Sequence, residues 1–106
     1  MNAKYVLGFC TVPDAPLAGK IAKTLVEERL AACCNIIPGI TSVYRWEKEV
    51  QTDSELLLLI KTSEERFDEL KKRILELHPY DVPEIITTSI SEGHIEYLKW
   101  IGENVR

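Results

Sequence analysis

The sequence has no paired cysteine motif and no cluster of basic residues. Its three cysteines are an odd number and form no C-x-x-C pair, so neither a disulfide framework nor a structural zinc site is indicated. Free thiols favour a reducing compartment, and we expect the protein to be cytoplasmic. The 17 acidic residues outnumber the 13 basic ones, giving a net charge of −4. Because binding to phosphates requires clustered Lys and Arg, nucleic acid is not an expected partner.

Long hydrophobic runs are also missing. No apolar segment approaches the ~20 residues of a membrane-spanning helix, so we expect no membrane partner. The N-terminus has no basic region followed by an apolar run, and therefore does not resemble a signal peptide. The chain has no internal repeat or linker. With 106 residues, of which 45% are hydrophobic, it is expected to fold as a single domain spanning residues 1–106.

The first half of the chain predicts a strand, a helix and a second strand. Residues 5–12 are β-branched and aromatic, which is typical of a buried strand. Apolar residues recur at helical spacing between residues 17 and 30, which predicts a helix. Asp14 comes just before it and is suited to cap it, because its carboxylate can accept a hydrogen bond from a free backbone amide. A strand then begins at Cys33. It is interrupted by Pro38-Gly39, a pair that favours a bulge in an edge strand.

The next segment predicts a turn, a strand and a helix. Residues 47–49 form the expected turn, and the apolar run at 56–60 has the length of a strand that is buried on both faces. A run of leucines could equally begin a helix. Strand is favoured because Thr62-Ser63-Glu64-Glu65 has the pattern of a capping box for a new helix. That helix has to end at Pro79.

A fourth strand at residues 83–90 and a short helix after Gly93 complete the predicted elements. The order β-α-β-β-α-β with right-handed crossovers makes the first and second strands parallel with a gap between them. The third strand fills this gap and the fourth pairs with the first. The sequence therefore predicts an α+β, ferredoxin-like sandwich with an antiparallel sheet, helices on one face and an extra C-terminal helix. This fold occurs in proteins with many different functions, so the fold alone does not identify the function.

The segment from His78 to Glu84 concentrates hydrogen-bonding and titratable side chains in one short connection. Its prolines at positions 79 and 83 fix the backbone φ at about −65°. The imidazole, phenol and carboxylates are therefore displayed on a stiff loop, which is what a binding site requires. The alternative is that the prolines only end one helix and begin an edge strand, with the polar groups in water.

The predicted topology brings Cys10, His78, Tyr80 and Glu84 to one end of the sheet. Cys33 should lie about a strand length (~20 Å) away. A thiolate together with an imidazole suits copper or zinc, so Cys10 and His78 are candidate metal ligands. The alternative is a buried thiol that lies beside a loop histidine without binding anything.

Cys10 has a second candidate role, as a nucleophile activated by His78 and oriented by Asp81. Gly8 lies inside the predicted strand rather than after it, so nothing like a nucleophile elbow or an oxyanion nest surrounds the thiol. We therefore expect that the protein is not an enzyme.

Three aromatic residues indicate association between chains. Tyr44 and Trp46 lie far along an edge strand, near a hairpin end, where a monomer would leave them in water, and Trp100 adds a third ring. Exposed aromatics beside an unpaired strand edge promote aggregation unless another chain covers them. A heterologous edge contact that closes gives a ring. The alternative is that these rings fold back over their own subunit.

Several short motifs occur in a fixed order from Cys10-Thr11-Val12-Pro13 almost to the C-terminus. They are Leu30-Ala31-Ala32-Cys33, Ile37-Pro38-Gly39, Ser42-Val43-Tyr44-Arg45-Trp46-Glu47, Lys61-Thr62, His78-Pro79-Tyr80-Asp81-Val82-Pro83-Glu84 and Tyr97-Leu98-Lys99-Trp100. This ordered set resembles the CutA divalent-cation tolerance proteins. The resemblance implies a homotrimer of ferredoxin-like subunits, similar in build to the nitrogen-regulatory P-II proteins, and an association with tolerance to copper and other divalent ions.

The resemblance also implies a weak site for Cu²⁺ or another divalent cation at Cys10 and His78. The family pattern has a histidine pair before Pro-Tyr, whereas here Leu77 precedes the single His78. Lys48 stands where the family often has Gly, so a wider hairpin loop is expected.

Ligand binding is expected in clefts between subunits. The residues expected to line these clefts are Trp46, Lys61, His78, Tyr80 and Glu84. The alternative function is that of a P-II-like sensor or scaffold, which would hold an anionic ligand on Lys61 while any metal is incidental.

Overall fold

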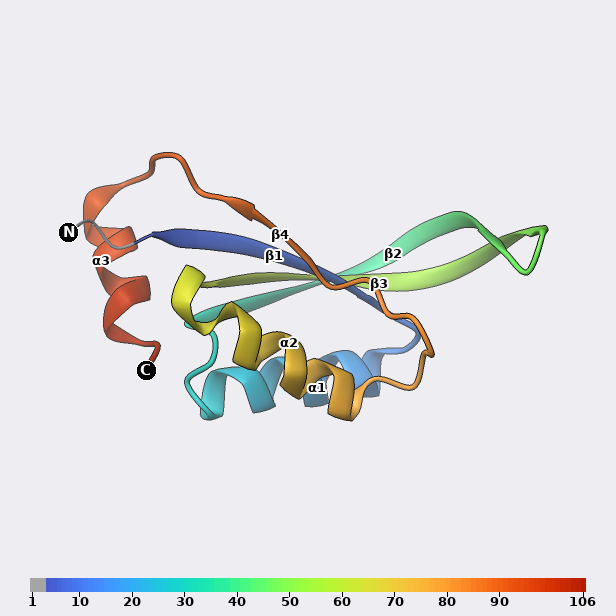
Figure 1. Cartoon of the computed structure of the whole chain (residues 1–106), viewed down its shortest axis with the longest axis horizontal. Coiled ribbons are helices and arrows are strands. Elements are labelled where there is room, and N and C mark those ends of the chain that lie inside the picture. Colours follow the sequence, from blue (N-terminus) through green and yellow to red (C-terminus); the bar gives the residue numbers. More distant parts are fainter. Residues whose placement is uncertain (1–3) are drawn as a thin grey trace.

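The computed structural model describes residues 4–106, and this part of the chain forms one four-stranded sheet and three α-helices (Figure 1). In chain order the elements are β1 (Tyr5–Val12), α1 (Ala15–Glu27), β2 (Cys33–Trp46), β3 (Glu49–Ser63), the 3₁₀ helix η1 (Glu64–Arg66), α2 (Phe67–Leu77), β4 (Ile86–Ser89) and α3 (Ile95–Glu103). Within the described range, no helix is long and apolar enough to cross a bilayer.

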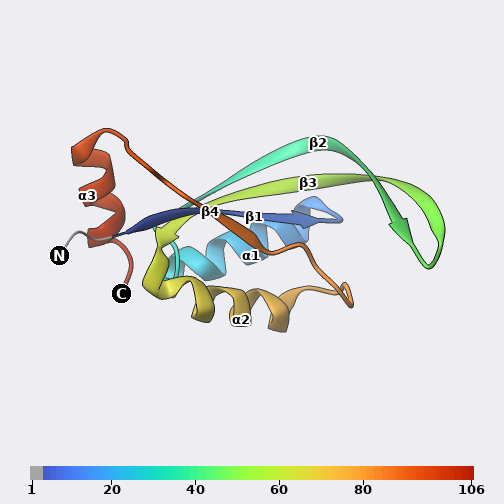
Figure 2. The ribbon, with the colours of Figure 1, turned by 45° about the horizontal axis from the view of Figure 1, so that its top comes forward.

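The strands lie in the order β2-β3-β1-β4, and every neighbouring pair is antiparallel. Helices α1 and α2 lie together on one face of the sheet, while α3 lies at one end beside the start of β1 (Figure 2). The predicted ferredoxin-like sandwich is thereby confirmed, including the strand order. β2 and β4 are the edge strands. An edge position is expected for β2, because it contains Pro38.

The core lies between the sheet and the pair α1 and α2. Alternate residues of β1 are buried, which is the period expected of a strand with one face on the core. The largest fully buried apolar side chains come from both layers: Ile21, Leu25, Leu58, Ile60, Leu70 and Ile74. Burial of each such side chain stabilises the fold by about 1.5–3 kcal/mol. Asp14 caps α1 as predicted, because its Oδ1 accepts a 2.8 Å hydrogen bond from the amide of Leu17.

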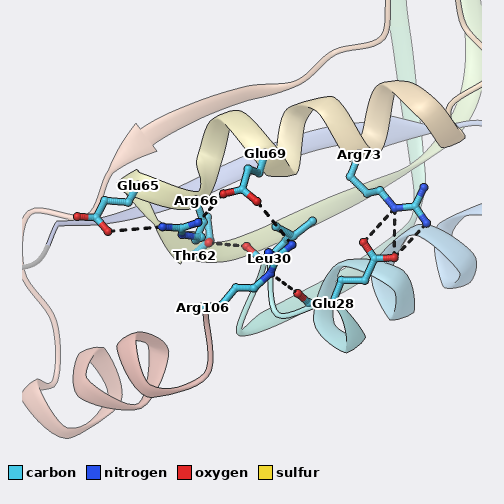
Figure 3. Close-up of polar contacts among 8 residues, drawn as sticks. All are labelled: Glu28, Leu30, Thr62, Glu65, Arg66, Glu69, Arg73 and Arg106. Atoms are coloured by element: carbon cyan, nitrogen blue, oxygen red, sulfur yellow. Dashed lines mark hydrogen bonds and ion pairs between the residues drawn. The ribbon is translucent and has the colours of Figure 1, made fainter.

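Polar contacts tie the two helices and the C-terminus together (Figure 3). The guanidinium of Arg73 on α2 donates to both carboxylate oxygens of Glu28, which follows α1, over 3.0–3.2 Å. Arg106 donates to the carbonyl of Glu28 at 3.0 Å and so anchors the chain end. The fully buried hydroxyl of Thr62 donates to the carbonyl of Leu30 at 2.6 Å, which satisfies both groups inside the core.

Residues 40–55 form a hairpin arm that projects beyond the sandwich (Figures 1 and 2). Pairing between β1 and β3 stops at Val12 and Leu56, whereas pairing between β2 and β3 continues to Trp46 and Glu49. The arm turns through the two residues 47 and 48, whose φ values of 49° and 71° are typical of a tight I′ turn. The expected wider loop at Lys48 was therefore wrong.

Other boundaries also differ from the prediction. β3 covers Glu49–Ser63 rather than 56–60, because its polar first half pairs with β2 outside the core. β4 is shorter than predicted, since only Ile86–Ser89 lies alongside β1. Ser63 occupies the N-cap position but makes no side-chain capping hydrogen bond, and one 3₁₀ turn precedes α2. The predicted bulge is present as a register shift between Ile37 and Ile40.

The face of the sheet opposite α1 and α2, here called the outer face, is only partly covered. α3 packs over its end, where a Cβ on Gly102 would meet the Tyr5 hydroxyl at 2.7 Å. The rest of this face is mainly apolar, although the register also places Asn35, Lys61 and Thr88 on it. By strand alternation and register it carries Leu7, Phe9, Ile37, Leu57, Leu59 and Ile86. These side chains are half-buried or exposed, and Ile86 reaches 57% exposure.

Candidate functional site

A pocket of about 710 Å³ lies at the base of the arm, next to the loop that follows α2. It forms where β1 has ended and β2 and β3 continue alone, so the loop can approach the arm. The residues that line it are Thr11, Ser42, Val43, Tyr44, Trp46, Glu55, Pro79, Tyr80, Asp81, Val82 and Glu84. The stiff loop from 79 to 84 therefore forms one wall, and the arm forms the other.

Three of the predicted cleft residues meet in this pocket, namely Trp46, Tyr80 and Glu84. Lys61 does not. It lies six residues along β3 from Glu55, which is about 20 Å, and its ammonium contacts the side chains of Asn35 and Cys33 instead. Within one chain, Lys61 cannot neutralise an anion that binds in this pocket.

Glu55 is the functional candidate that sequence reasoning missed. Its side chain lines the pocket although the residue is only 7% exposed. The hydroxyl of Tyr80 donates a 2.8 Å hydrogen bond to Glu55 Oε2. Burial, and then this bond to the carboxylate, raise the pKa of Tyr80, so the phenol remains a donor. The sequence signal for Glu55 is its position immediately before the five apolar residues 56–60 of β3.

The pocket wall is acidic and aromatic. Asp81 and Glu84 add two carboxylates to that of Glu55, and no lysine or arginine of the described chain is among the lining residues. Tyr44 donates a hydrogen bond to Asp53 on the neighbouring strand of the arm, and this bond raises the pKa of Tyr44. Tyr44 and Trp46 are 41% and 43% exposed, which confirms that these rings remain in water in one subunit.

Cys10 and His78 lie behind the pocket rather than in it. Cys10 is fully buried, and its burial, followed by the charge of Glu84, raises the pKa of the thiol to about 12. His78 is 8% exposed, and its Nε2 donates to the carbonyl of Thr11 at 2.8 Å. Its Nδ1 accepts from the amide of Tyr80 at 3.2 Å. This pair of bonds requires the tautomer that is protonated on Nε2.

The observed arrangement does not fit a resident metal ion. The Cys10 thiol is protonated at neutral pH, and both ring nitrogens of His78 are engaged by the backbone. Between residues 4 and 106, no three His, Cys, Asp or Glu side chains gather closely enough to hold a metal ion. Any ion bound by this pair would have to displace the backbone contacts of His78.

The remaining cysteines lie closer to Cys10 than predicted. Cys33 pairs with Lys61, which also pairs with Leu7 on β1. Cys33 is therefore about 10 Å further along the strands than Cys10 and about 10 Å away across the sheet, so the two lie roughly 14 Å apart rather than a strand length. Cys34 packs against the core, where burial raises the pKa of its thiol to about 12. Cys33 points to the opposite face from Cys34, as its adjacent position predicts.

We expect Cys10 and Cys34 to resist alkylation in the folded protein. Their pKa values of about 12 make the thiolate fraction roughly a thousandfold smaller than that of a thiol at the ordinary value of 9. Iodoacetamide at pH 8, followed by peptide mass spectrometry, should label these two residues at least a hundredfold more slowly than in urea. The control is the same protein unfolded in urea. Rapid labelling of Cys10 in the native state would instead support the nucleophile alternative.

The fold and the pocket define a class of protein: a small ferredoxin-like domain whose sheet keeps an apolar outer face and whose pocket lies beside a projecting hairpin. Comparison with known families is specific. The CutA1 divalent ion tolerance protein family matches residues 6–104, which is nearly the whole chain. The chain belongs to this family.

Individual relatives agree with this assignment. The divalent-cation tolerance protein CutA of Thermus thermophilus is 60% identical over 94 residues, covering 89% of this chain and 91% of its own. A solved structure of the Thermus thermophilus protein superposes with a TM-score of 0.94 at 55% identity, covering 96% of this chain and 99% of its own. A rice relative, CutA 1, chloroplastic, is 45% identical over 95% of this chain, which spans only 57% of that protein.

Proposed function

We propose that this protein is a homotrimeric metal-response protein of the cytoplasm that binds divalent cations weakly and catalyses no reaction. Family membership supports the metal response, because the Thermus thermophilus relative carries the name of a divalent-cation tolerance protein. The observation that carries the proposal of assembly is the bare outer face together with the projecting arm.

The outer face and the arm both need a covering. Val43 and Val50 of the arm are 66% and 63% exposed, and the arm continues a sheet whose outer face is apolar. Apolar surface of this extent beside edge strands favours contact with another chain. An arm that reaches a different part of the next copy makes a heterologous contact, and such contacts close into a ring when the rotation allows. Three copies are proposed because the resemblance to the CutA family implies a homotrimer.

The proposed metal ligands are Cys10 and His78, with copper as the first candidate ion. Binding is expected to be weak for a structural reason. The ion has to compete with the hydrogen bonds of His78 to Thr11 and Tyr80, and with the proton of a thiol whose pKa is about 12. Leu77 also supplies no second imidazole.

A second candidate function is that of a P-II-like sensor that uses the pocket at the base of the arm. The pocket volume of about 710 Å³ is ample for a small organic ligand. The anionic ligand predicted for this role does not match the acidic lining, since Lys61 lies elsewhere in the subunit. A sensor built on this pocket would therefore respond to a cation.

Calorimetric titration with Cu²⁺ and Zn²⁺ tests the metal proposal. Cys10→Ala and His78→Ala should each weaken binding at least tenfold, which is about 1.4 kcal/mol. His94→Ala is the matched control, because His94 is the other histidine and is exposed before α3. Thermal unfolding followed by circular dichroism has to show that each variant is folded. Unchanged binding in both Cys10→Ala and His78→Ala would remove this metal site.

A further inference from the structure

We infer that the pocket at the base of the arm binds an extended organic cation, a diamine or polyamine, rather than a bare metal ion or an anion. The inference rests on the proposed function only in taking this pocket as a ligand site, and it does not require metal binding at Cys10 and His78. Four properties of the pocket carry it: its charge, a buried carboxylate, its aromatic walls and the spacing of its acidic groups.

The charge of the pocket is one-sided. Glu55, Asp81 and Glu84 line it, and lysine and arginine are absent from its lining within residues 4–106. The whole chain has a net charge of −4, so long-range attraction also favours a cation. Hydrogen-bond donors and a positive charge are therefore what a ligand of this pocket has to provide.

Glu55 is a buried carboxylate that lacks a cationic partner. The residue is 93% buried, and its Oε2 accepts one hydrogen bond, from the neutral phenol of Tyr80. Throughout the described chain, no lysine, arginine or histidine lies within ion-pair distance of it. Within the described chain this carboxylate therefore has no cationic partner, and a ligand ammonium group would supply one. An ammonium group that donates to Oε1 would complete the hydrogen bonding of Glu55.

Aromatic and apolar side chains line the pocket together with the carboxylates. Trp46 and Tyr44 contribute rings from the arm, while Tyr80 and Val82 contribute apolar surface from the loop. Aromatic faces attract organic cations, and the methylene groups between two ammonium groups can pack on the same surface. Such walls offer nothing to a hydrated metal ion.

The spacing of the acidic groups also discriminates against a metal ion. Divalent cations gather several oxygen ligands within about 2.0–2.6 Å of one point. The pocket carboxylates come from β3 and from two positions of the loop, and no three His, Cys, Asp or Glu side chains in the described range are close enough to form such a set. Carboxylates that do not gather at one point, in a pocket that also has apolar walls, match a ligand whose own charges are separated by methylene groups.

Titration calorimetry of the full chain with spermidine and with putrescine tests this inference. Both amines should bind the wild type, and 1,4-butanediol, which replaces the ammonium groups of putrescine with hydroxyls, should give no binding. Glu55→Gln should weaken spermidine binding at least tenfold. The matched control is Glu65→Gln, which makes the same change at a side chain that is 85% exposed on η1, and it should stay within twofold of the wild type.

Several outcomes would overturn the inference. These are absence of spermidine binding at millimolar concentration and low salt, equal binding by Glu55→Gln and wild type, or full displacement of spermidine by stoichiometric Mg²⁺. If Glu55→Gln does not fold, Glu84→Gln replaces it, because Glu84 is exposed and its substitution leaves the core intact. Glu84→Gln should then weaken spermidine binding at least tenfold.

Two further readouts separate this inference from the proposed function. Binding of spermidine by a monomeric variant but not by the assembled protein would show that a neighbouring copy fills the pocket, which overturns the inference. Sedimentation and copper titration of the same samples report on the proposed function. A trimer that binds copper but no amine overturns the inference alone, whereas an amine-binding monomer overturns the proposed assembly and supports the inference.

Discussion

Replacement of Leu59 by glutamate is expected to convert the assembled protein into monomers. Leu59 lies on β3 near the middle of the sheet, paired with Phe9 on β1 and with Asn35 on β2, and its side chain belongs to the outer face. If copies cover this face, the substitution removes apolar contact and buries a carboxylate, a cost of several kcal/mol at each contact that Lys61, two residues along the same face of β3, offsets only in part. Sedimentation velocity at micromolar concentration measures the change.

Leu75→Glu is the matched control for this substitution. Leu75 is 52% exposed on α2, on the other side of the sheet, and the change of charge is the same. This variant should sediment like the wild type. If Leu59→Glu also remains assembled and folded, the outer face does not form the contact between copies.

Replacement of Leu58 by alanine is expected to destabilise the subunit by about 2–5 kcal/mol. Leu58 is fully buried between the sheet and the helices, so the truncation removes packed apolar surface and leaves a cavity. Urea unfolding at a fixed protein concentration measures the loss, since the stability of an oligomer depends on concentration. Leu75→Ala, at an exposed position, should change stability by less than about 1 kcal/mol. A loss below about 1 kcal/mol in Leu58→Ala would contradict the position of the core.

The neighbouring positions 58 and 59 thus separate folding from assembly. Their side chains point to opposite faces of β3, because side chains alternate along a strand. Leu58→Ala should lower the free energy of unfolding of the subunit, whereas Leu59→Glu should lower the mass of the sedimenting species. A pair of adjacent leucines in one apolar run therefore reports on two different surfaces of the sheet.

The order of elements and the arrangement of the sheet could be predicted from local patterns. The helical spacing after Asp14, the bulge at Pro38-Gly39 and the helix end before Pro79 are each determined by residues close in sequence. Right-handed crossovers then leave a single arrangement of the four strands, which the structure confirms. These features depend on backbone restraints and periodicity, so one sequence was sufficient.

The arm was less predictable because its strands leave the core. Residues 51–54 are polar and show no strand pattern, yet they pair with β2 along the whole hairpin. The turn places Glu47 and Lys48 in the left-handed region, where Gly or Asn is the usual signal. In both segments the backbone pairing of the long hairpin outweighs the local preference.

The predicted site consists of clefts between subunits, and these stay a prediction. Within one subunit the structure places three of the expected cleft residues, Trp46, Tyr80 and Glu84, around one pocket. The position of Lys61 depends on the register between β2 and β3 before the bulge, and that of Glu55 on the register after it; local sequence sets neither. The engagement of both nitrogens of His78 likewise depends on Thr11, which is distant in sequence.

Sedimentation equilibrium of the wild-type protein across the micromolar range tests the proposed assembly most directly. The outer face and the projecting arm predict association, and the family resemblance sets the expected species at three times the 12.1 kDa mass of a single chain. A well-behaved species of 12.1 kDa at these concentrations would contradict it, and the apolar outer face would then need a different explanation.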